Sequence, residues 1–167
     1  KLGNISLSGS FSGFYNDFVS EALLSTSIGS IETDLSVKHN SKKKKNLYQG
    51  RLRANSLDLG SISGKSNIAG NISFDTYLSG ETYENGKINL HIAGLVDSIT
   101  IKGINYNDII LAGDVDNKKF KGKLKMQDEL AYMDFDGFLD FNTRQPTADF
   151  RLELRDAYLD LLNLSSR

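Results

Sequence analysis

The sequence has no cysteine and only one proline in 167 residues. The absence of cysteine excludes a disulfide framework and a thiolate metal site, and it fits the periplasm and the cytosol equally. Neither sign of charge dominates, because the chain has 20 Lys and Arg and 21 Asp and Glu. The net charge therefore does not indicate binding to nucleic acid or to an acidic partner. No apolar run approaches the roughly 18 to 20 residues needed to cross a bilayer.

The chain starts at Lys1 and no signal-peptide pattern precedes it. We therefore expect an internal piece of a longer protein. Its length suits one ordinary hydrophobic core, and no segment resembles a linker. We expect a single repetitive β-sheet segment over residues 1–167.

The scarcity of proline, together with 15 glycines, favours an all-β fold. Most apolar residues are Leu, Ile, Phe and Tyr, set singly between polar ones in the alternation typical of half-buried strands. The pattern predicts a meander of roughly ten to twelve strands, a size at which open sheets curl or split.

The segment 92–126 repeats a short pattern, apolar-x-Gly-x, with glycines spaced by nine, ten and nine residues. Its copies are Ile92-Ala-Gly94, Ile101-Lys-Gly103, Leu111-Ala-Gly113 and Phe120-Lys-Gly122, and Phe135-Asp-Gly137 adds another. Each glycine has the parity of its apolar neighbours, which places it on the same face of the sheet. Such glycines mark bends that curve the sheet, or notches where another surface or a ligand chain approaches the backbone.

Two architectures accommodate this pattern. Composition alone favours a closed β-sandwich, in which the glycines relieve crowding between two sheets. The periodic glycines favour an elongated, curved antiparallel meander that forms an open apolar trough. The trough is our prediction, with one short helical segment at residues 14–24 or 159–164.

Two loops have clear signatures. Residues 39–46 read HNSKKKKN, which predicts either a solvated hairpin tip or a polybasic patch for anionic lipid or nucleic acid. The strand patterns on both sides favour the hairpin tip. Asn85-Gly86 predicts a two-residue type I′ hairpin, within a connection that we place at residues 76–86.

Catalytic signatures are sparse. The chain has no Gly-x-Ser-x-Gly elbow and no glycine-rich phosphate loop, and His91 has the parity of a solvated strand residue. Asp134 and Asp136 could bind calcium or serve glycosidic acid–base chemistry. Residues two apart on a strand also lie on the same face of the sheet, so the two aspartates could simply share its polar face. We expect no enzymatic activity, no cofactor and no metal.

The ordered series of short motifs resembles the TamB family, the long AsmA-like proteins of the Gram-negative envelope. The resemblance covers most of the chain and rests on no single motif. In the first half it is carried by Phe11-Ser-Gly13, Gly29-Ser-Ile31, Tyr48-Gln-Gly50 and Leu57-Asp-Leu59-Gly60. In the second half it is carried by Ile101-Lys-Gly103, Ile109-Ile-Leu111-Ala-Gly113, Phe120-Lys-Gly122, Asp134-Phe-Asp136-Gly137 and Asp156-Ala.

This resemblance implies a β-taco, a long sheet folded lengthwise around an apolar interior. It implies a periplasmic location, in a protein anchored to the inner membrane outside this segment. It also implies traffic of phospholipid between the two membranes and a BamA-like outer-membrane barrel partner, with neighbouring repeats of the same chain extending the sheet. No nucleic-acid partner is implied.

The first hypothesis is a non-enzymatic groove that shields or conducts acyl chains. The expected lipid contacts are Ile99, Ile101, Ile109, Leu111, Val115, Phe120, Leu124, Met126, Phe135, Leu139 and Phe141, and the expected groove notches are Gly94, Gly103, Gly113, Gly122 and Gly137. A second hypothesis is a scaffold for nascent outer-membrane strands that pairs through its edges. A third is a cell-surface β-sandwich adhesin with a closed core and calcium at Asp134 and Asp136.

Overall fold

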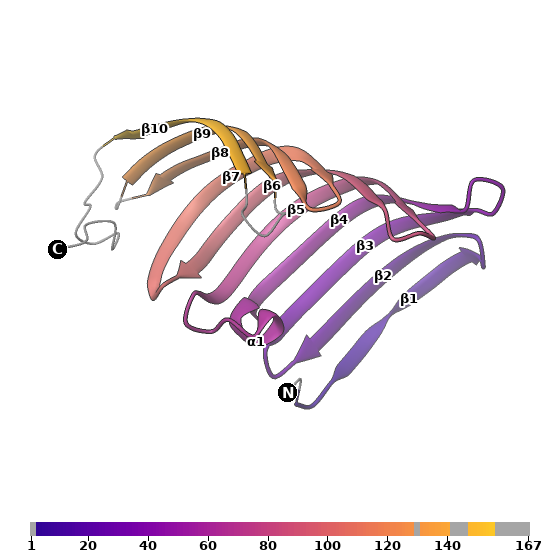
Figure 1. Ribbon diagram of the computed structural model, residues 1–167. Coiled ribbons are helices and arrows are strands. Elements are labelled where there is room, and N and C mark those ends of the chain that lie inside the picture. The colour runs from indigo at the N-terminus through magenta and orange to yellow at the C-terminus, as the bar shows by residue number, and fades with distance from the viewer. Residues whose placement is uncertain (1–2, 129–130, 141–146, 156–167) are drawn as a thin grey trace.

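The computed structural model describes residues 3–128, 131–140 and 147–155. The described residues form one sheet of ten antiparallel strands, paired in chain order from β1 to β10 (Figure 1). The strands are β1 Ser6–Phe14, β2 Asp17–Thr26, β3 Gly29–Asn40, β4 Lys45–Asp58, β5 Ala69–Tyr83, β6 Ile88–Ile101, β7 Ile104–Asp116, β8 Lys119–Asp128, β9 Ala131–Asp140 and β10 Thr147–Arg155. The predicted all-β meander is confirmed.

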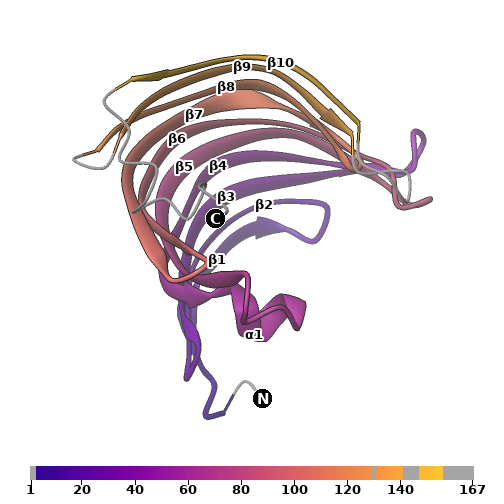
Figure 2. The same cartoon turned by 60° about the vertical axis from the view of Figure 1, so that its left-hand side comes forward.

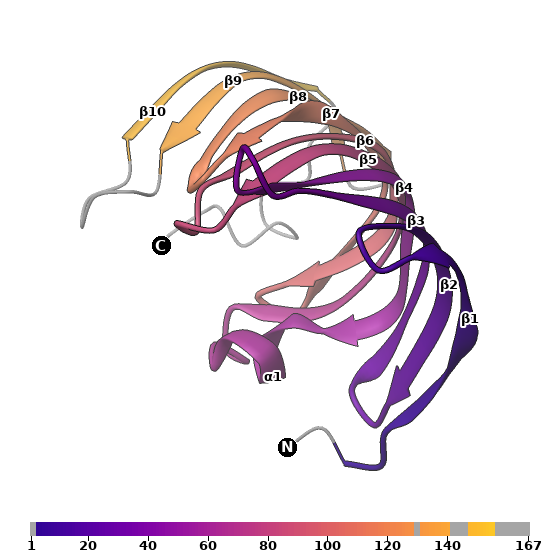
Figure 3. The same ribbon diagram turned by 90° about the vertical axis from the view of Figure 1, so that its right-hand side faces the viewer.

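The sheet is an open arch (Figures 2 and 3). Each strand bends along its length, so the sheet as a whole is curved and is open on one side. No second sheet covers either face in the described parts of the chain. The alternative of a closed β-sandwich is therefore wrong for this segment.

The register separates an apolar face from a polar one. Leu111 of β7 pairs with Leu124 of β8, which pairs with Phe135 of β9, while the intervening residues are mostly charged. In β2 and β3 the apolar parity is half-buried and the polar parity is exposed. Side chains crowd together on the concave side of a bend and spread apart on the convex side. The apolar face is thus the inner face of the arch, and the polar face is the outer one.

A line of irregularities crosses β4 to β7 near one edge. Ser56 of β4 and Asp108 of β7 have left-handed φ values of 49° and 53°. The β4–β5 register shifts at Ser56, and the β5–β6 register shifts where Asp97 is the extra residue. An extra residue in a strand reverses the alternation beyond it. Inner residues accordingly change from even to odd numbers in β6, from Val96 to Ile99.

Three local expectations are wrong. Residues 17–26 form β2 rather than a helical turn, because Val19 and Leu23 are outer-face residues and not a helical stripe. The expected connection 76–86 is mostly strand, since β5 continues to Tyr83. Asn85-Gly86 lies in a three-residue loop in which the Gly86 N–H donates to the Tyr83 carbonyl, and only Gly86 has positive φ.

The described helix is α1, Leu59–Ser63, which crosses from β4 to β5. Asp58 caps it by accepting from the Ser61 N–H at 2.9 Å, and Gly64 ends it with φ of 71°. A short helix was expected elsewhere, at 14–24 or at 159–164, and the latter range lies outside the described residues. Within the described chain, no helix has the length and apolar character to cross a membrane.

Candidate functional site: the apolar inner face

The inner face is built from rows of residues that run across the strands. One row passes through Leu52, Thr76, Gly94, Leu111 and Leu124, each from a different strand, and continues to Phe135 and Leu152. Among the side chains that the structure describes, no Asp, Glu, Lys or Arg has the inner parity. The described side chains therefore give the arch an uncharged lining, which extends along β8 as far as Asp128, a residue of inner parity at the end of that strand.

Most of the predicted lipid contacts lie on this face. Those placed there are Ile99, Ile109, Leu111, Val115, Phe120, Leu124, Met126, Phe135 and Leu139. Ile101 shares the face but sits beside the β6–β7 turn, where it is 40% exposed. Phe141 lies outside the described residues.

Met126 is the least exposed apolar residue of the face. It is 4% exposed and contacts Tyr106, Ile109 and Met133. Tyr106 was missing from the predicted contacts because the inner residues of β7 have odd numbers after Asp108 and even numbers before it. The bulge therefore brings an unforeseen residue onto the inner face.

One polar side chain is buried among these apolar ones. Thr76 is 2% exposed, and its hydroxyl donates to the Leu52 carbonyl at 3.1 Å. A buried hydroxyl without a partner would destabilise the fold, whereas this one is satisfied by the neighbouring strand. The lining thus presents no unsatisfied polar group at this point.

The space above the predicted notch glycines is occupied by the protein itself. Gly113, Gly122 and Gly137 form one row, and a Cβ at Gly113 would lie 2.6 Å from a ring carbon of Phe120. At Gly137 the near atoms are the Cβ and Cα of Phe150 in β10, so the close approach there is between neighbouring strands. The space that we expected above Gly113 is occupied by the Phe120 ring, and the prediction that these glycines are gaps for a ligand chain stays a prediction.

Two other predicted notches have separate explanations. Gly94 has φ of 159°, and a Cβ there would lie 2.6 Å from the Thr76 Cα, so the close approach is between neighbouring strands. Gly103 is not on the inner face at all. It has φ of 80° in the two-residue turn that joins Ile101 to Ile104, where Lys102 also has positive φ. Its role is to form a type I′ hairpin turn.

The outer face carries ladders of ion pairs between strands. Lys125 and Lys123 of β8 contact Asp134 and Asp136 of β9 at 3.3 Å and 3.2 Å. The aspartates considered for calcium are thus paired with lysines. In the described residues, no group of three or more His, Asp or Glu is placed to hold a metal ion.

A second network spans β3 to β5. Arg51 forms a bidentate pair with Asp75, and Arg53 bridges Asp75 and Glu32 at 3.2 Å and 3.0 Å. The hydrogen bonds from Arg51 hold the pKa of Asp75 below its usual range. On β6, exposed His91 contacts Asp114 at 2.9 Å, which confirms its outward orientation. These networks tie strands together.

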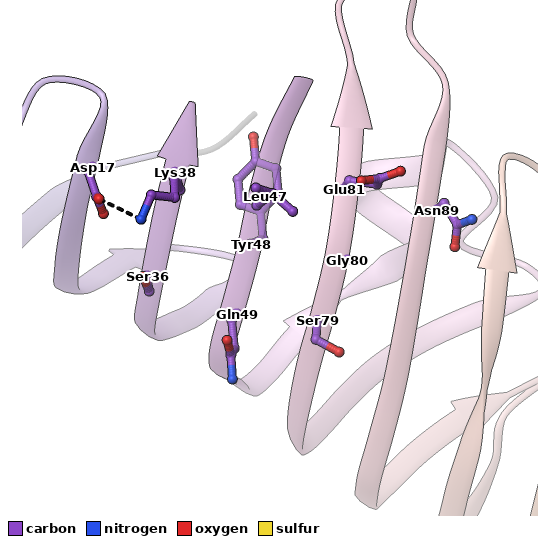
Figure 4. A pocket seen from close by; sticks show the side chains of 10 residues that line it. All are labelled: Asp17, Ser36, Lys38, Leu47, Tyr48, Gln49, Ser79, Gly80, Glu81 and Asn89. Carbon is purple, nitrogen blue, oxygen red and sulfur yellow. Dashed lines mark ion pairs between the residues drawn. The ribbon is translucent and has the colours of Figure 1, made fainter. Parts of the chain in front are cut away.

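Figure 4 shows a shallow pocket on the outer face of β2 to β6. Asp17 and Lys38 form an ion pair of 2.7 Å at one end, and Gln49 and Ser79 lie near its middle. The pocket is open to solvent, its lining is polar and apolar in about equal parts, and its charged groups are already paired. The inner face is the larger and more uniform surface, and we take it as the candidate site.

The chain matches no family model, and no curated protein or solved structure matches it either.

Proposed function

We propose that this segment is a wall of a groove that shields or conducts phospholipid acyl chains. The observation that carries the proposal is the uncharged, apolar inner face, which runs across ten strands without a covering layer in the described residues. A soluble protein does not normally leave so extensive an apolar surface without a client or a cover. The resemblance of the motifs to the TamB family supports the same function.

The energetics favour a lining of this kind. Exposure of one methylene to water costs about 0.8 kcal/mol, so an acyl chain of about 16 carbons costs on the order of 10 kcal/mol to expose. A conduit must offset this cost along the whole path, but it need not bind the lipid tightly at any one position. Rows of Leu, Ile, Val and Phe do so without a polar group that would select one lipid.

The dimensions also suit an acyl chain. Ten strands with nine spacings of about 4.8 Å give a trough about 43 Å long. One leaflet contributes about 15 Å to the hydrocarbon core of a bilayer, which is about 30 Å thick. The trough is therefore longer than one tail, and a lipid can move along it from one strand to the next.

The decisive experiment places a charge on each face at adjacent positions. Leu111→Asp puts a carboxylate on the inner face, while the matched control Ile110→Asp puts one on the outer face, where Ile110 is 58% exposed. We expect the inner variant to lose lipid capture or transport and the outer variant to retain it. Circular dichroism and thermal unfolding establish that both variants are folded.

A photo-crosslinker at Leu124, which also lies on the inner face, reports the client directly. We expect it to capture phospholipid in cells, and a crosslinker at Lys123 on the outer face to capture none. Crosslinks to protein alone at Leu124 would overturn the proposal. Complete unfolding of both Leu111→Asp and the milder Leu111→Ser would show instead that this face is a closed interior.

A second candidate function is a scaffold for nascent outer-membrane strands, which would need an accessible strand such as β1, a strand that pairs only with β2 among the described strands. This strand of nine residues is exposed throughout and contains no charge and no proline. Natural edge strands usually carry charged residues or proline, which prevent pairing with other chains. A BamA-like barrel partner belongs to this proposal through the family resemblance. Ser10→Pro in β1 should block strand capture while leaving lipid capture intact.

The adhesin hypothesis is not supported. It requires a closed core and calcium at Asp134 and Asp136, whereas the described sheet is open and these aspartates contact lysines.

A further inference from the structure

The two long edges of the trough differ in chemistry. At one edge lie the turns β1–β2, β3–β4, β5–β6 and β7–β8, and at the other lie α1 and the turns β2–β3 and β6–β7. The β3–β4 turn, residues 41–44, carries three consecutive lysines and projects from the sheet at the first edge (Figure 2). We call this first edge the basic rim.

The basic rim is a continuous surface. The Glu84 N–H donates to the Lys44 carbonyl at 3.1 Å, which joins the β5–β6 turn to the β3–β4 turn. The Asn117 N–H donates to the Ile88 carbonyl at 2.9 Å, which joins the β7–β8 turn to the start of β6. The turns are thus held together by backbone hydrogen bonds, and the lysines on them share one surface.

Several ammonium groups on this rim make no ion pair with a described carboxylate. Lys44 and Lys45 contact Glu84 and Glu81. The remaining lysines of the three turns are exposed and make no ion pair with any described residue, namely Lys42, Lys43, Lys87 and Lys118. Lys43 also acts on Glu81 at longer range. The basic rim therefore carries more lysines than are held in ion pairs with described carboxylates.

On β3, β4 and β5 the inner face becomes polar as it approaches the basic rim. His39, Asn46 and Thr82 of these three strands form its last row there, and His39 Nδ1 lies 2.8 Å from Asn46 Oδ1. Towards the opposite edge the same three strands stay apolar, at Ile31, Leu57 and Ile72. On these strands the trough thus passes from apolar to polar to cationic towards the basic rim.

We propose that the basic rim binds the phosphate of a phospholipid whose acyl chains lie against the inner face. This inference rests on the proposed function and adds the orientation of the lipid and a preference for anionic headgroups. An amphipathic molecule has the same order of chemistry, with an apolar tail, a polar glycerol region and a charged phosphate. Lysines near an anionic lipid contribute about fivefold each to binding.

The test compares two lipids that differ only in the headgroup. Short-chain phosphatidylglycerol and the diacylglycerol with the same acyl chains are titrated into the purified chain, and occupancy is read by native mass spectrometry. The rim variant combines Lys42→Gln, Lys43→Gln, Lys87→Gln and Lys118→Gln. Its control combines Lys65→Gln and Lys102→Gln, at the opposite edge.

We expect wild-type protein and the control to prefer phosphatidylglycerol over diacylglycerol by at least tenfold, and this preference to fall with added salt. We expect the rim variant to lose the preference and to bind diacylglycerol as wild type does. Inorganic phosphate at millimolar concentration should compete with phosphatidylglycerol and leave diacylglycerol binding unchanged.

Each contrary result has a distinct meaning. Equal binding of the two lipids by wild type, or a preference that the rim variant retains, would overturn the inference and leave the proposed groove intact. Failure of wild type to bind either lipid would overturn the proposed function itself. Phosphatidylglycerol binding that Leu111→Asp does not weaken would show adsorption of the headgroup alone, which also overturns the inference.

Discussion

The Phe120 ring occupies the space that a side chain at Gly113 would need, with a ring carbon 2.6 Å from the position of the missing Cβ. Gly113→Ala should therefore destabilise the fold by about 1 to 3 kcal/mol through overpacking. Ala112→Ser, at the neighbouring exposed position, should change stability by less than about 0.5 kcal/mol. Urea unfolding measures both. Combining Gly113→Ala with Phe120→Leu should recover part of the loss, and simple additivity would contradict the packing of the ring on the glycine.

Met126→Ala should cost about 2 to 4 kcal/mol, because Met126 is 4% exposed and fills the space between Tyr106 and Met133. Ile110→Ala, which removes an exposed apolar side chain from the outer face, serves as the control and should cost far less. A loss of similar size in the two variants would mean that the inner face is not the better-packed one. Differential scanning calorimetry gives the comparison.

Stability should decline in acid through the carboxylates paired across strands. Arg51 lowers the pKa of Asp75 from its usual 3.8, and Lys45, followed by Tyr83, lowers the pKa of Glu81 from its usual 4.5. A carboxyl group whose pKa is lower in the folded state stabilises the fold above its unfolded pKa, and this contribution is lost as pH falls through the folded value. Wild type should thus lose stability as pH falls below about 4.5. The variant Asp75→Asn should show a shallower decline in chemical unfolding between pH 6 and pH 3, and an unchanged slope would argue against the Arg51 contact.

Lys102→Asn should raise stability by about 0.3 to 1 kcal/mol. Lys102 has φ of 49° in a two-residue turn with Gly103, and Asn-Gly is the preferred sequence for such a turn. Lys118→Asn provides the control, since Lys118 has no positive φ in the turn that follows β7. A gain of equal size at both positions would show that the effect does not come from the left-handed conformation. Thermal unfolding of the three proteins is sufficient.

Much of the fold followed from alternation alone. Strands β3, β8 and β9 keep a period of two throughout, and the hairpin tip at 41–44 was evident from its lysines. The strand β2 was missed because Val19 and Leu23 place apolar side chains on the outer face. In such a strand both faces contain apolar residues, and periodicity no longer separates strand from helix.

The bulges were harder to foresee. Nothing in the residue types of Ser56 or Asp108 requires a left-handed φ. The sequence indicates a bulge only indirectly, because the apolar positions change from even to odd numbers between Gly94 and Ile99. The covering of Gly113 and Gly122 by the Phe120 ring was also beyond reach. It depends on the rotamer that the ring adopts across a strand boundary, and spacing along one chain does not encode that choice.

The pairing of each strand only with its predecessor and successor has a consequence for cooperativity. Among the described strands, extensive contacts join only immediate neighbours, so no packing between distant strands closes the sheet. Unfolding should begin at the outermost strands and travel inward, so amide hydrogen exchange should slow from β1 and β10 towards β5 and β6. A wall of this construction can be lengthened strand by strand while its cross-section stays the same.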